Sequence, residues 1–223
     1  MIKSISSSLL LSFALTAACA TSADAFIEKR HFDRYYGTRA LEVADPSGGP
    51  IAPFEPSQSV LEEDFEVEWG GYTITAVHGF GIEALVLGRK DYTQGDFGAL
   101  LPIDLALAWG QVSDPKWVQH LRIEQSDRVY RWSYPRGTPL NAEVVALNSA
   151  NMHIMPASPD IQKKLDSVAR GDVVRLAGFL VDITMQSDDG AMEFEWLTSR
   201  VRTDTGLGAC EVILVTSVEI EGR

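Results

Sequence analysis

Short apolar runs separated by glycine-containing turns follow one another from residue 65 to the end of the chain. Residues 72–77 and 82–87 are rich in branched and aromatic side chains, which are typical of strands, and residues 78–81 between them predict a hairpin. Residues 128–134 alternate between two faces, as a half-buried strand does. The pattern also predicts strands at 142–147, 172–184, 192–198 and 210–220.

Two segments carry signals for the start of a helix. Ser-Asp-Pro at residues 113–115 precedes a brief expected helix at 116–121. Ser-Pro-Asp at 158–160 precedes apolar residues at helical spacing up to Gly171. A capping side chain followed by proline favours a helix at both places. Residues 100–109 are apolar and fit either a short helix or a buried connection.

The expected fold class is therefore mainly β with two or three short helices, an α+β protein. Gly178 lies in the middle of the long strand at 172–184, where a small barrel bends or bulges. A helix, a glycine-interrupted strand, a hairpin and a closing strand in this order are compatible with an OB-like small barrel in the C-terminal half.

The first 25 residues have the pattern of a secretory signal peptide. Lys3 precedes residues 5–18, which are apolar or small, and Ala23-Asp24-Ala25 supplies the small residues of a cleavage site before Phe26. No other apolar run approaches the roughly 20 residues of a membrane-spanning helix, so no transmembrane span is expected after removal of the signal. We expect the protein to be periplasmic or secreted.

Two alternatives keep the protein on a membrane. The signal can remain uncleaved and serve as an anchor. Cys19 follows two alanines, and this is the setting of a lipidated cysteine. The cleaner Ala-x-Ala site favours cleavage over both alternatives.

The rest of the chain divides into an arm and a body. Residues 26–64 contain four prolines and Gly48-Gly49 between residues 44 and 59, which predicts a Pro/Gly-rich arm or linker. Residues 65–223 are expected to form a single β-rich globular domain. Removal of the signal would leave Cys210 as the single cysteine, so we expect stability to come from an apolar core.

Composition narrows the function. The chain of 223 residues is 45% hydrophobic and 22% charged, as globular proteins are, and its formal net charge of −12 makes nucleic-acid binding improbable. The histidines are scattered and no cysteine pair has metal-ligand spacing, so neither a metal nor a cofactor is expected. The expected partner is a protein or a small polar ligand of the cell envelope.

Two sets of residues are candidates for a site. Cys210, His153 and Asn151 are the residue types of a thiol hydrolase, in which the thiolate attacks, the imidazole activates it and the amide orients the ring. Cys210 also begins an apolar strand, where a free cysteine usually behaves as a small buried hydrophobe.

The second set, Arg200, Arg202 and Asp204, lies in a polar, glycine-bearing loop. Arginine side chains and backbone N–H groups in such a loop can bind a small polar or anionic group. The alternative is a turn that satisfies its own polar groups, with Arg200 paired to a carboxylate.

Three segments, at residues 102–115, 149–154 and 208–215, resemble an uncharacterised family of exported bacterial proteins over about residues 65–220. The resemblance implies export from a bacterium and no particular reaction or ligand.

The sequence thus favours a non-enzymatic binding or interaction domain of the envelope. An envelope hydrolase that uses Cys210 with His153 is the alternative, and a lipid-anchored structural protein is a third reading.

Overall fold

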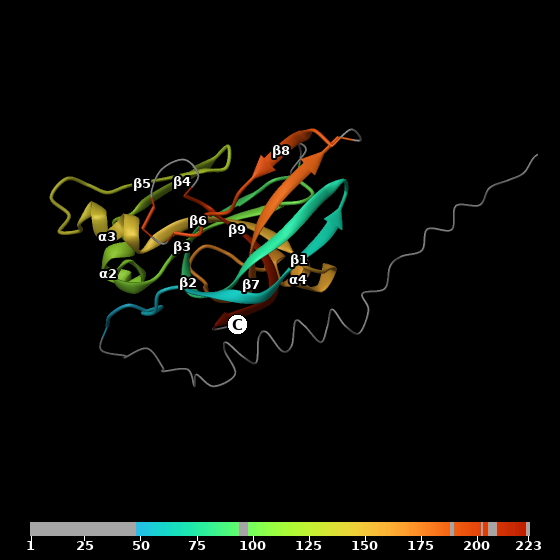
Figure 1. Ribbon diagram of the computed structural model, residues 1–223. Helices are drawn as coiled ribbons and strands as arrows, with labels where there is room; N and C mark the ends of the chain where they lie inside the picture. Colours follow the sequence, from blue (N-terminus) through green and yellow to red (C-terminus); the bar gives the residue numbers. More distant parts are fainter. Residues whose placement is uncertain (1–47, 94–97, 188–189, 202, 205–208, 222–223) are drawn as a thin grey trace, which may run out of the picture.

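The computed structural model describes residues 48–93, 98–187, 190–201, 203–204 and 209–221 (Figure 1). The predicted signal peptide, Cys19 and most of the predicted arm lie outside these ranges. The described strands are β1 (Ser57–Trp69), β2 (Tyr72–Asp91), β3 (Ile103–Ala108), β4 (Arg122–Ser126), β5 (Val129–Ser133), β6 (Ser149–Pro156), β7 (Val173–Gln186), β8 (Met192–Trp196) and β9 (Glu211–Glu221). The described helices are the 3₁₀ turn η1 (Gly110–Ser113) and the α-helices α2 (Pro115–Val118), α3 (Ala142–Leu147) and α4 (Pro159–Asp166). The predicted fold class, mainly β with short helices, is confirmed.

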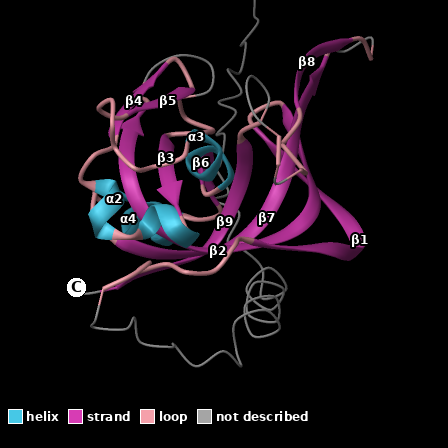
Figure 2. Cartoon of the chain, turned by 90° about the vertical axis from the view of Figure 1, so that its left-hand side faces the viewer, coloured by secondary structure: helices cyan, strands magenta, loops and turns pink. Residues whose placement is uncertain are grey.

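Five strands form a closed ring in the order β2-β3-β6-β9-β7. The ring closes because β2 pairs with β3 along one edge and with β7 along the other. β6 and β9 run parallel, and the other neighbours in the ring run antiparallel. β1 and β8 extend the sheet beyond the ring, on β2 and β7 respectively (Figure 2). A small barrel was expected in the C-terminal half of the chain. The closed ring also includes β2 and β3 from the N-terminal half, so it is not confined to the C-terminal half.

Gly178 lies where β7 crosses close to β9. The pairing register between these strands shifts between Ala177 and Gly178. A Cβ atom at position 178 would collide with the backbone carbonyl oxygen of Leu214. The expected irregularity at this glycine is therefore confirmed, and its cause is the close approach of two backbones.

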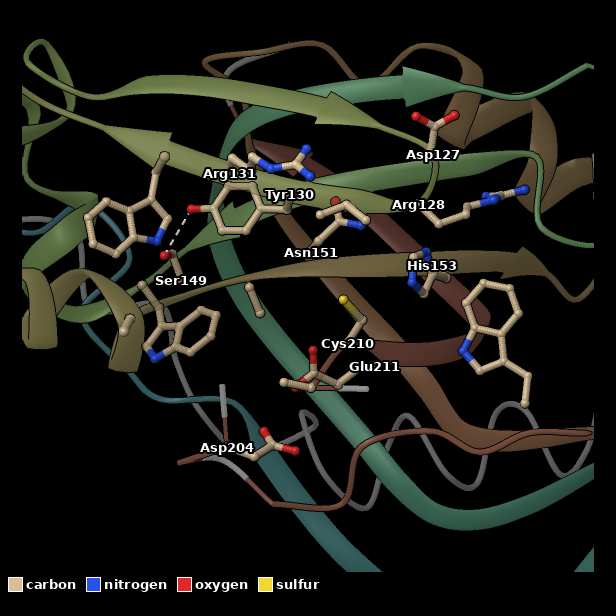
Figure 3. A pocket seen from close by; sticks show the side chains of 17 residues that line it. Asp127, Arg128, Tyr130, Arg131, Ser149, Asn151, His153, Asp204, Cys210 and Glu211 are labelled. Carbon is tan, nitrogen blue, oxygen red and sulfur yellow. Dashed lines mark hydrogen bonds between the residues drawn. The ribbon is translucent and has the colours of Figure 1, made fainter. Parts of the chain in front are cut away.

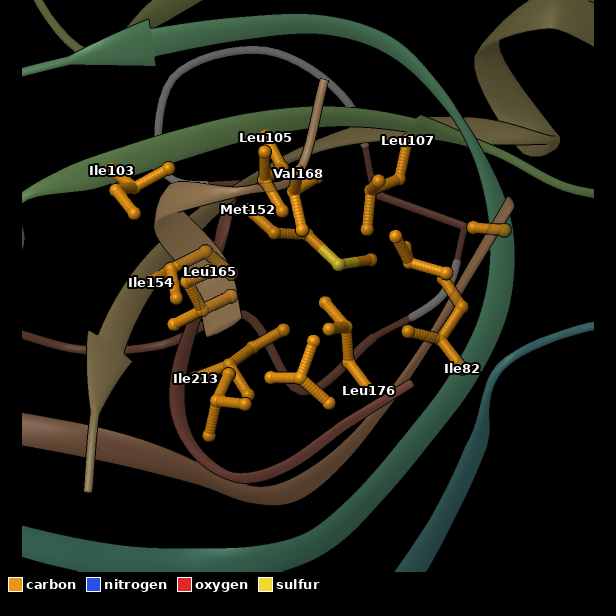
Figure 4. Packing of buried hydrophobic residues seen from close by; sticks show 14 of the residues in the cluster. Ile82, Ile103, Leu105, Leu107, Met152, Ile154, Leu165, Val168, Leu176 and Ile213 are labelled. Carbon is orange, nitrogen blue, oxygen red and sulfur yellow. The ribbon is translucent and has the colours of Figure 1, made fainter. Parts of the chain in front are cut away.

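The interior of the ring is a continuous apolar core (Figure 4). Each strand contributes every second side chain, and those of Ile82, Leu105 and Met152 are at most 1% exposed. Burying one such side chain contributes about 1.5–3 kcal/mol. α4 adds Leu165 to this core, and its start is fixed as predicted, because the Ser158 hydroxyl accepts a hydrogen bond from the Ile161 N–H.

A second apolar cluster lies on the outer face of β2 and β3. Ala106 and Ala108 alternate along β3 with the residues that enter the ring. The β4–β5 hairpin and α3 cover them with Ile123, Tyr130 and Val145. The hairpin is thereby held against the outside of the ring, and this determines where the candidate site lies.

Two predictions around β2 and β3 are wrong. The expected hairpin at 78–81 is the middle of one continuous strand, because β1 and β7 pair with this segment from both sides and occupy its backbone groups. Most of residues 100–109, expected as a helix or connection, is the buried strand β3. β1 begins at Ser57, inside the segment assigned to the arm.

The segment at 142–147 is also corrected. It was expected as a strand, and it is the helix α3. The Asn141 side chain accepts a hydrogen bond from the Glu143 N–H, a capping signal that outweighs the β preference of Val144 and Val145. The next strand, β6, was not predicted. The positions of α2, α4, β5, β7, β8 and β9 agree with the predictions to within a few residues.

Candidate functional site

A cavity of about 630 Å³ lies between the β4–β5 hairpin, β6, the start of β9 and the segment that leads into β9 (Figure 3). Asn151, His153 and Cys210, predicted as one set from the sequence, all line it. Asp204, from the second predicted set, lines it as well. Figure 3 shows Cys210 and Glu211 between Asn151 and His153 on one side and Asp204 on the other.

His153 is oriented by a buried carboxylate. Asp104 on β3 and His153 on β6 are register partners, so their side chains project from the same face of the sheet. His153 Nδ1 lies 2.8 Å from Asp104 Oδ1, and the residues are 1% and 0% exposed. With an ionised carboxylate as partner, Nδ1 carries the hydrogen of this bond. The imidazole is therefore held in one orientation.

Asp104 has further partners. Arg128 Nη1 lies 2.7 Å from Asp104 Oδ1, and the Asn151 amide donates to Oδ2 at 3.2 Å. Burial by itself would raise the pKa of Asp104. The hydrogen bond and charge of His153, followed by the charge of Arg128, outweigh burial and hold the pKa of this carboxyl below its usual value. The carboxylate is thus ionised at neutral pH.

Arg128 reaches Asp104 from the tip of the β4–β5 hairpin. Asp127 and Arg128 form the two-residue loop with φ angles of 52° and 63°, in the left-handed region that costs side chains other than glycine free energy. The guanidinium carbon of Arg128 lies 3.6 Å from the centre of the Tyr92 ring, and the Arg128 N–H donates to the Tyr92 hydroxyl at 3.1 Å. Since Tyr92 directly follows β2, these contacts hold the tip of the hairpin against the closed ring of strands.

Asn151 does not orient the imidazole as the sequence analysis supposed. Its amide nitrogen donates to Asp104, and its Oδ1 accepts from Gln125 Nε2 at 2.8 Å. Asp104 orients the ring instead. Asn151 lines the cavity and links this carboxylate to the hairpin.

Aromatic rings form much of the remaining wall. Trp109, Trp132 and Trp196 line the cavity, and the Trp196 ring meets the His153 ring edge to face at 4.8 Å. The Tyr130 hydroxyl donates to Ser149 Oγ at 3.0 Å, and Ser149 donates in turn to a backbone carbonyl. Burial raises the pKa of Tyr130 to about 12, so the phenol stays protonated. Tyr130 and Trp132 of β5 therefore pack against the outer apolar cluster and also border the cavity.

Cys210 lacks the features of an activated nucleophile. Burial, followed by the negative charges of Asp104 and Asp204, raises the pKa of the thiol to about 11. In the part of the chain that the structure describes, no hydrogen bond joins Cys210 to His153. The next residue, Glu211, also lines the cavity and is only 2% exposed.

Of the second predicted set, Arg200, Arg202 and Asp204, the structure places Asp204 at the cavity and Arg200 away from it. Arg200 forms an ion pair with Asp182 and does not line the cavity, in agreement with the alternative of a carboxylate partner. Asp204 Oδ2 accepts a hydrogen bond from the Ser199 hydroxyl at 2.7 Å. Arg202 lies outside the described residues.

Sequence reasoning missed three residues of the site: Asp104, Arg128 and Glu211. The sequence did contain a signal for Asp104, because it is the single carboxylate within the otherwise apolar β3. Glu211, beside Cys210 at the start of the apolar β9, gave a similar signal. Carboxylates are rarely buried without partners, so both positions indicated a site.

Within the described residues, no group of three His, Cys, Asp or Glu side chains is arranged to hold a metal ion. None of the described helices has the length and apolar character that crossing a membrane requires.

Comparison with known proteins identifies no relative. No family model, no curated protein and no solved structure matches the chain. The resemblance to an exported bacterial family therefore stays a prediction.

Proposed function

We propose that the protein is a binding domain that holds a small polar ligand in the cavity beneath the β4–β5 hairpin and performs no reaction on it. The observation that carries the proposal is a cavity of about 630 Å³ whose wall is supported by a buried polar network around Asp104. Ligand sites are typically concave, largely aromatic and apolar, with a few polar groups placed in advance, and this cavity has that composition.

The position of the cavity on the ring supports the same function. The five ring strands, numbered along the chain, are β2, β3, β6, β7 and β9. Their order around the ring is therefore one-two-three-five-four, and α4 connects the third strand to the fourth. The cavity lies on the face of the third strand, β6, and beside the segment between the fourth and fifth, β7 and β9. OB folds bind oligonucleotides and oligosaccharides on the equivalent face and loop. A net charge of −12 opposes a polyanionic ligand, which leaves small or uncharged polar ligands and cations.

A thiol hydrolase is the second candidate. It is supported by the bond between Asp104 and His153 and by the presence of Cys210 on the same cavity wall. The raised pKa of Cys210 and the lack of a hydrogen bond to the imidazole oppose it. The binding function is therefore preferred.

The proposal includes a cellular setting. The predicted signal at residues 1–25 supports a periplasmic or secreted protein, with attachment through an uncleaved signal or a lipidated Cys19 as the alternative.

Filling the cavity tests the binding function. Ala146 on α3 lines the cavity, whereas its neighbour Leu147 is 38% exposed and does not. A library of small polar metabolites is screened by two-dimensional NMR against the wild type, Ala146→Trp and Leu147→Trp. We expect ligands that shift the signals of Asn151, His153 and Cys210, that lose affinity in Ala146→Trp and that retain it in Leu147→Trp.

Two results would overturn the proposal. One is a library in which every ligand that binds does so outside the cavity, or none binds. The other is a ligand that the wild type converts to product and that Cys210→Ser leaves intact.

A further inference from the structure

His153 presents one ring nitrogen to the cavity. Its Nδ1 is engaged by Asp104, and no hydrogen bond to Nε2 is formed by any residue that the structure describes. The side chain is 2% exposed and lines the cavity. In the neutral imidazole the nitrogen opposite the protonated Nδ1 is an acceptor. In this neutral form His153 offers a ligand in the cavity a fixed, buried hydrogen-bond acceptor.

Three polar side chains of the wall donate hydrogen bonds within the protein. The Tyr130 hydroxyl donates to Ser149, the Ser149 hydroxyl to the carbonyl of Val145, and the Asn151 amide to Asp104. The carboxylate of Glu211 also lines the cavity, and a carboxylate accepts several hydrogen bonds at once. The Glu211 carboxylate and His153 Nε2 are acceptors in the lining, and they suit a ligand that carries hydrogen-bond donors.

The charges of the wall favour a cation. Arg128 is engaged by Asp104, and the other acidic and basic side chains that line the cavity are three carboxyl groups, Asp127, Asp204 and Glu211, and one guanidinium, Arg131. The pKa of Cys210 is raised in part by Asp104 and Asp204, which is consistent with a negative potential at the thiol. An anion entering the cavity would be repelled by the same carboxylates.

The aromatic walls suit the same class of ligand. Trp109, Trp132 and Trp196 line the cavity together with Tyr130. The faces of such rings attract ammonium groups, and the attraction is strongest where water is excluded. Aromatic rings beside a buried carboxylate are a combination that holds protonated amines.

We infer that the cavity recognises a small organic ligand through a protonated amine, which is seated between the Glu211 carboxylate and the aromatic walls and donates a hydrogen bond to His153 Nε2. The inference rests on the proposed binding function and specifies the ligand class. Sugars and other neutral polyols are the competing class, because they also stack on aromatic rings.

A series of probes that differ in charge tests the inference. The probes are 2-phenylethylamine, 2-phenylethanol and phenylacetate, then cyclohexylamine, cyclohexanol and cyclohexanecarboxylate, with D-glucose as a neutral polyol. Affinities are measured by NMR titration of the full chain at neutral pH and low salt. We expect each amine to bind at least tenfold more tightly than the alcohol and the carboxylate of its own series, with signal shifts at His153 and Cys210.

Two variants locate the charge that is responsible. Glu211→Gln keeps the shape of a cavity residue and removes its charge, whereas Glu195→Gln removes an exposed charge on β8 outside the cavity. We expect the first variant to weaken amine binding at least tenfold and the second to change it less than twofold. Backbone spectra check the folding of both variants, and if Glu211→Gln does not fold, the ranking of probes on the wild type decides.

The inference is overturned if an alcohol, a carboxylate or glucose binds in the cavity as tightly as the amines. It is also overturned if no amine binds there, or if Glu211→Gln folds and binds the amines undiminished. None of these results contradicts the binding function itself, which the metabolite screen with Ala146→Trp decides separately.

Discussion

The imidazole of His153 is fixed to the carboxylate of Asp104 by a bond of 2.8 Å between Nδ1 and Oδ1, with both side chains almost completely buried. The two residues are register partners on neighbouring strands, so the sheet itself sets their separation. A polar group that is oriented before the ligand arrives reduces the entropy lost on binding. The same pair would also serve a thiol enzyme, so the state of Cys210 distinguishes the two functions.

Removal of the Asp104 carboxylate is expected to destabilise the fold strongly. Asp104→Ala removes the buried carboxylate that Arg128, Asn151 and His153 share, and breaking such a buried ion pair costs about 3–5 kcal/mol of the free energy of unfolding. Asp91→Ala is the control, because Asp91 also pairs with an arginine but is 56% exposed, and its loss is expected to cost less than about 1 kcal/mol. Urea unfolding measures both. Equal costs for the two variants would contradict the account of the network.

The lowered pKa of Asp104 predicts that the stability of the fold depends on pH. Its pKa is lower in the folded protein than the ordinary value of 3.8, so the carboxylate stabilises the fold above the unfolded pKa. This contribution is lost as the pH falls from about 4 through the folded pKa. Asp104→Asn lacks it, and the stability difference between wild type and variant is therefore expected to shrink on acidification. A difference in unfolding free energy that stays constant from pH 7 to pH 3 would refute the assignment.

Gly178 is expected to tolerate no side chain. A Cβ there would collide with the Leu214 carbonyl, and because backbone atoms cannot move away as a flexible side chain does, Gly178→Ala is expected to cost about 2 kcal/mol or more. Gly137→Ala is the control: its φ is 90° and no atom lies near the new methyl group, so backbone strain of about 1 kcal/mol is expected. Thermal and urea unfolding provide the measurement. If Gly178→Ala lowers the free energy of unfolding no more than Gly137→Ala does, the close approach of β7 and β9 is not what requires glycine at position 178.

The exported form is expected to begin at Phe26. Mass spectrometry of the intact protein from a bacterial host and of its N-terminal peptide decides between the three possibilities at this end. A free Phe26 agrees with cleavage after Ala25, a diacylglycerol-bearing Cys19 indicates a lipid anchor, and an intact Met1 indicates that the signal is retained. Either of the last two results would contradict the predicted cleavage.

Local signals in the sequence predicted much of the fold. Ser158 followed by Pro159 marked the start of α4, and Gly178 marked the irregularity in β7, because capping and steric requirements act over a few residues. The continuity of β2 through Gly79 and Gly81 was not predictable in this way. It depends on β1 and β7, strands distant in the sequence that pair with both edges of the segment.

The site was predicted in part for a similar reason. Asn151, His153 and Cys210 were chosen by residue type, and they do line one cavity. The role of Asp104 depends on the pairing of β3 with β6, and β6 was not recognised as a strand. Arg128 reaches the network because the hairpin folds over the ring, which is a tertiary relationship that no local pattern contains.

The most direct test of the central claim, that this cavity is a binding site and not the active site of a thiol enzyme, is the rate at which Cys210 is alkylated as a function of pH. Iodoacetamide is applied to the native protein between pH 7 and pH 10, and the Cys210 peptide is quantified by mass spectrometry. A pKa of about 11 predicts slow alkylation at pH 7 and a rate that keeps rising about tenfold per pH unit across this range. Fast alkylation that levels off below pH 8 would show an activated thiolate and contradict the claim.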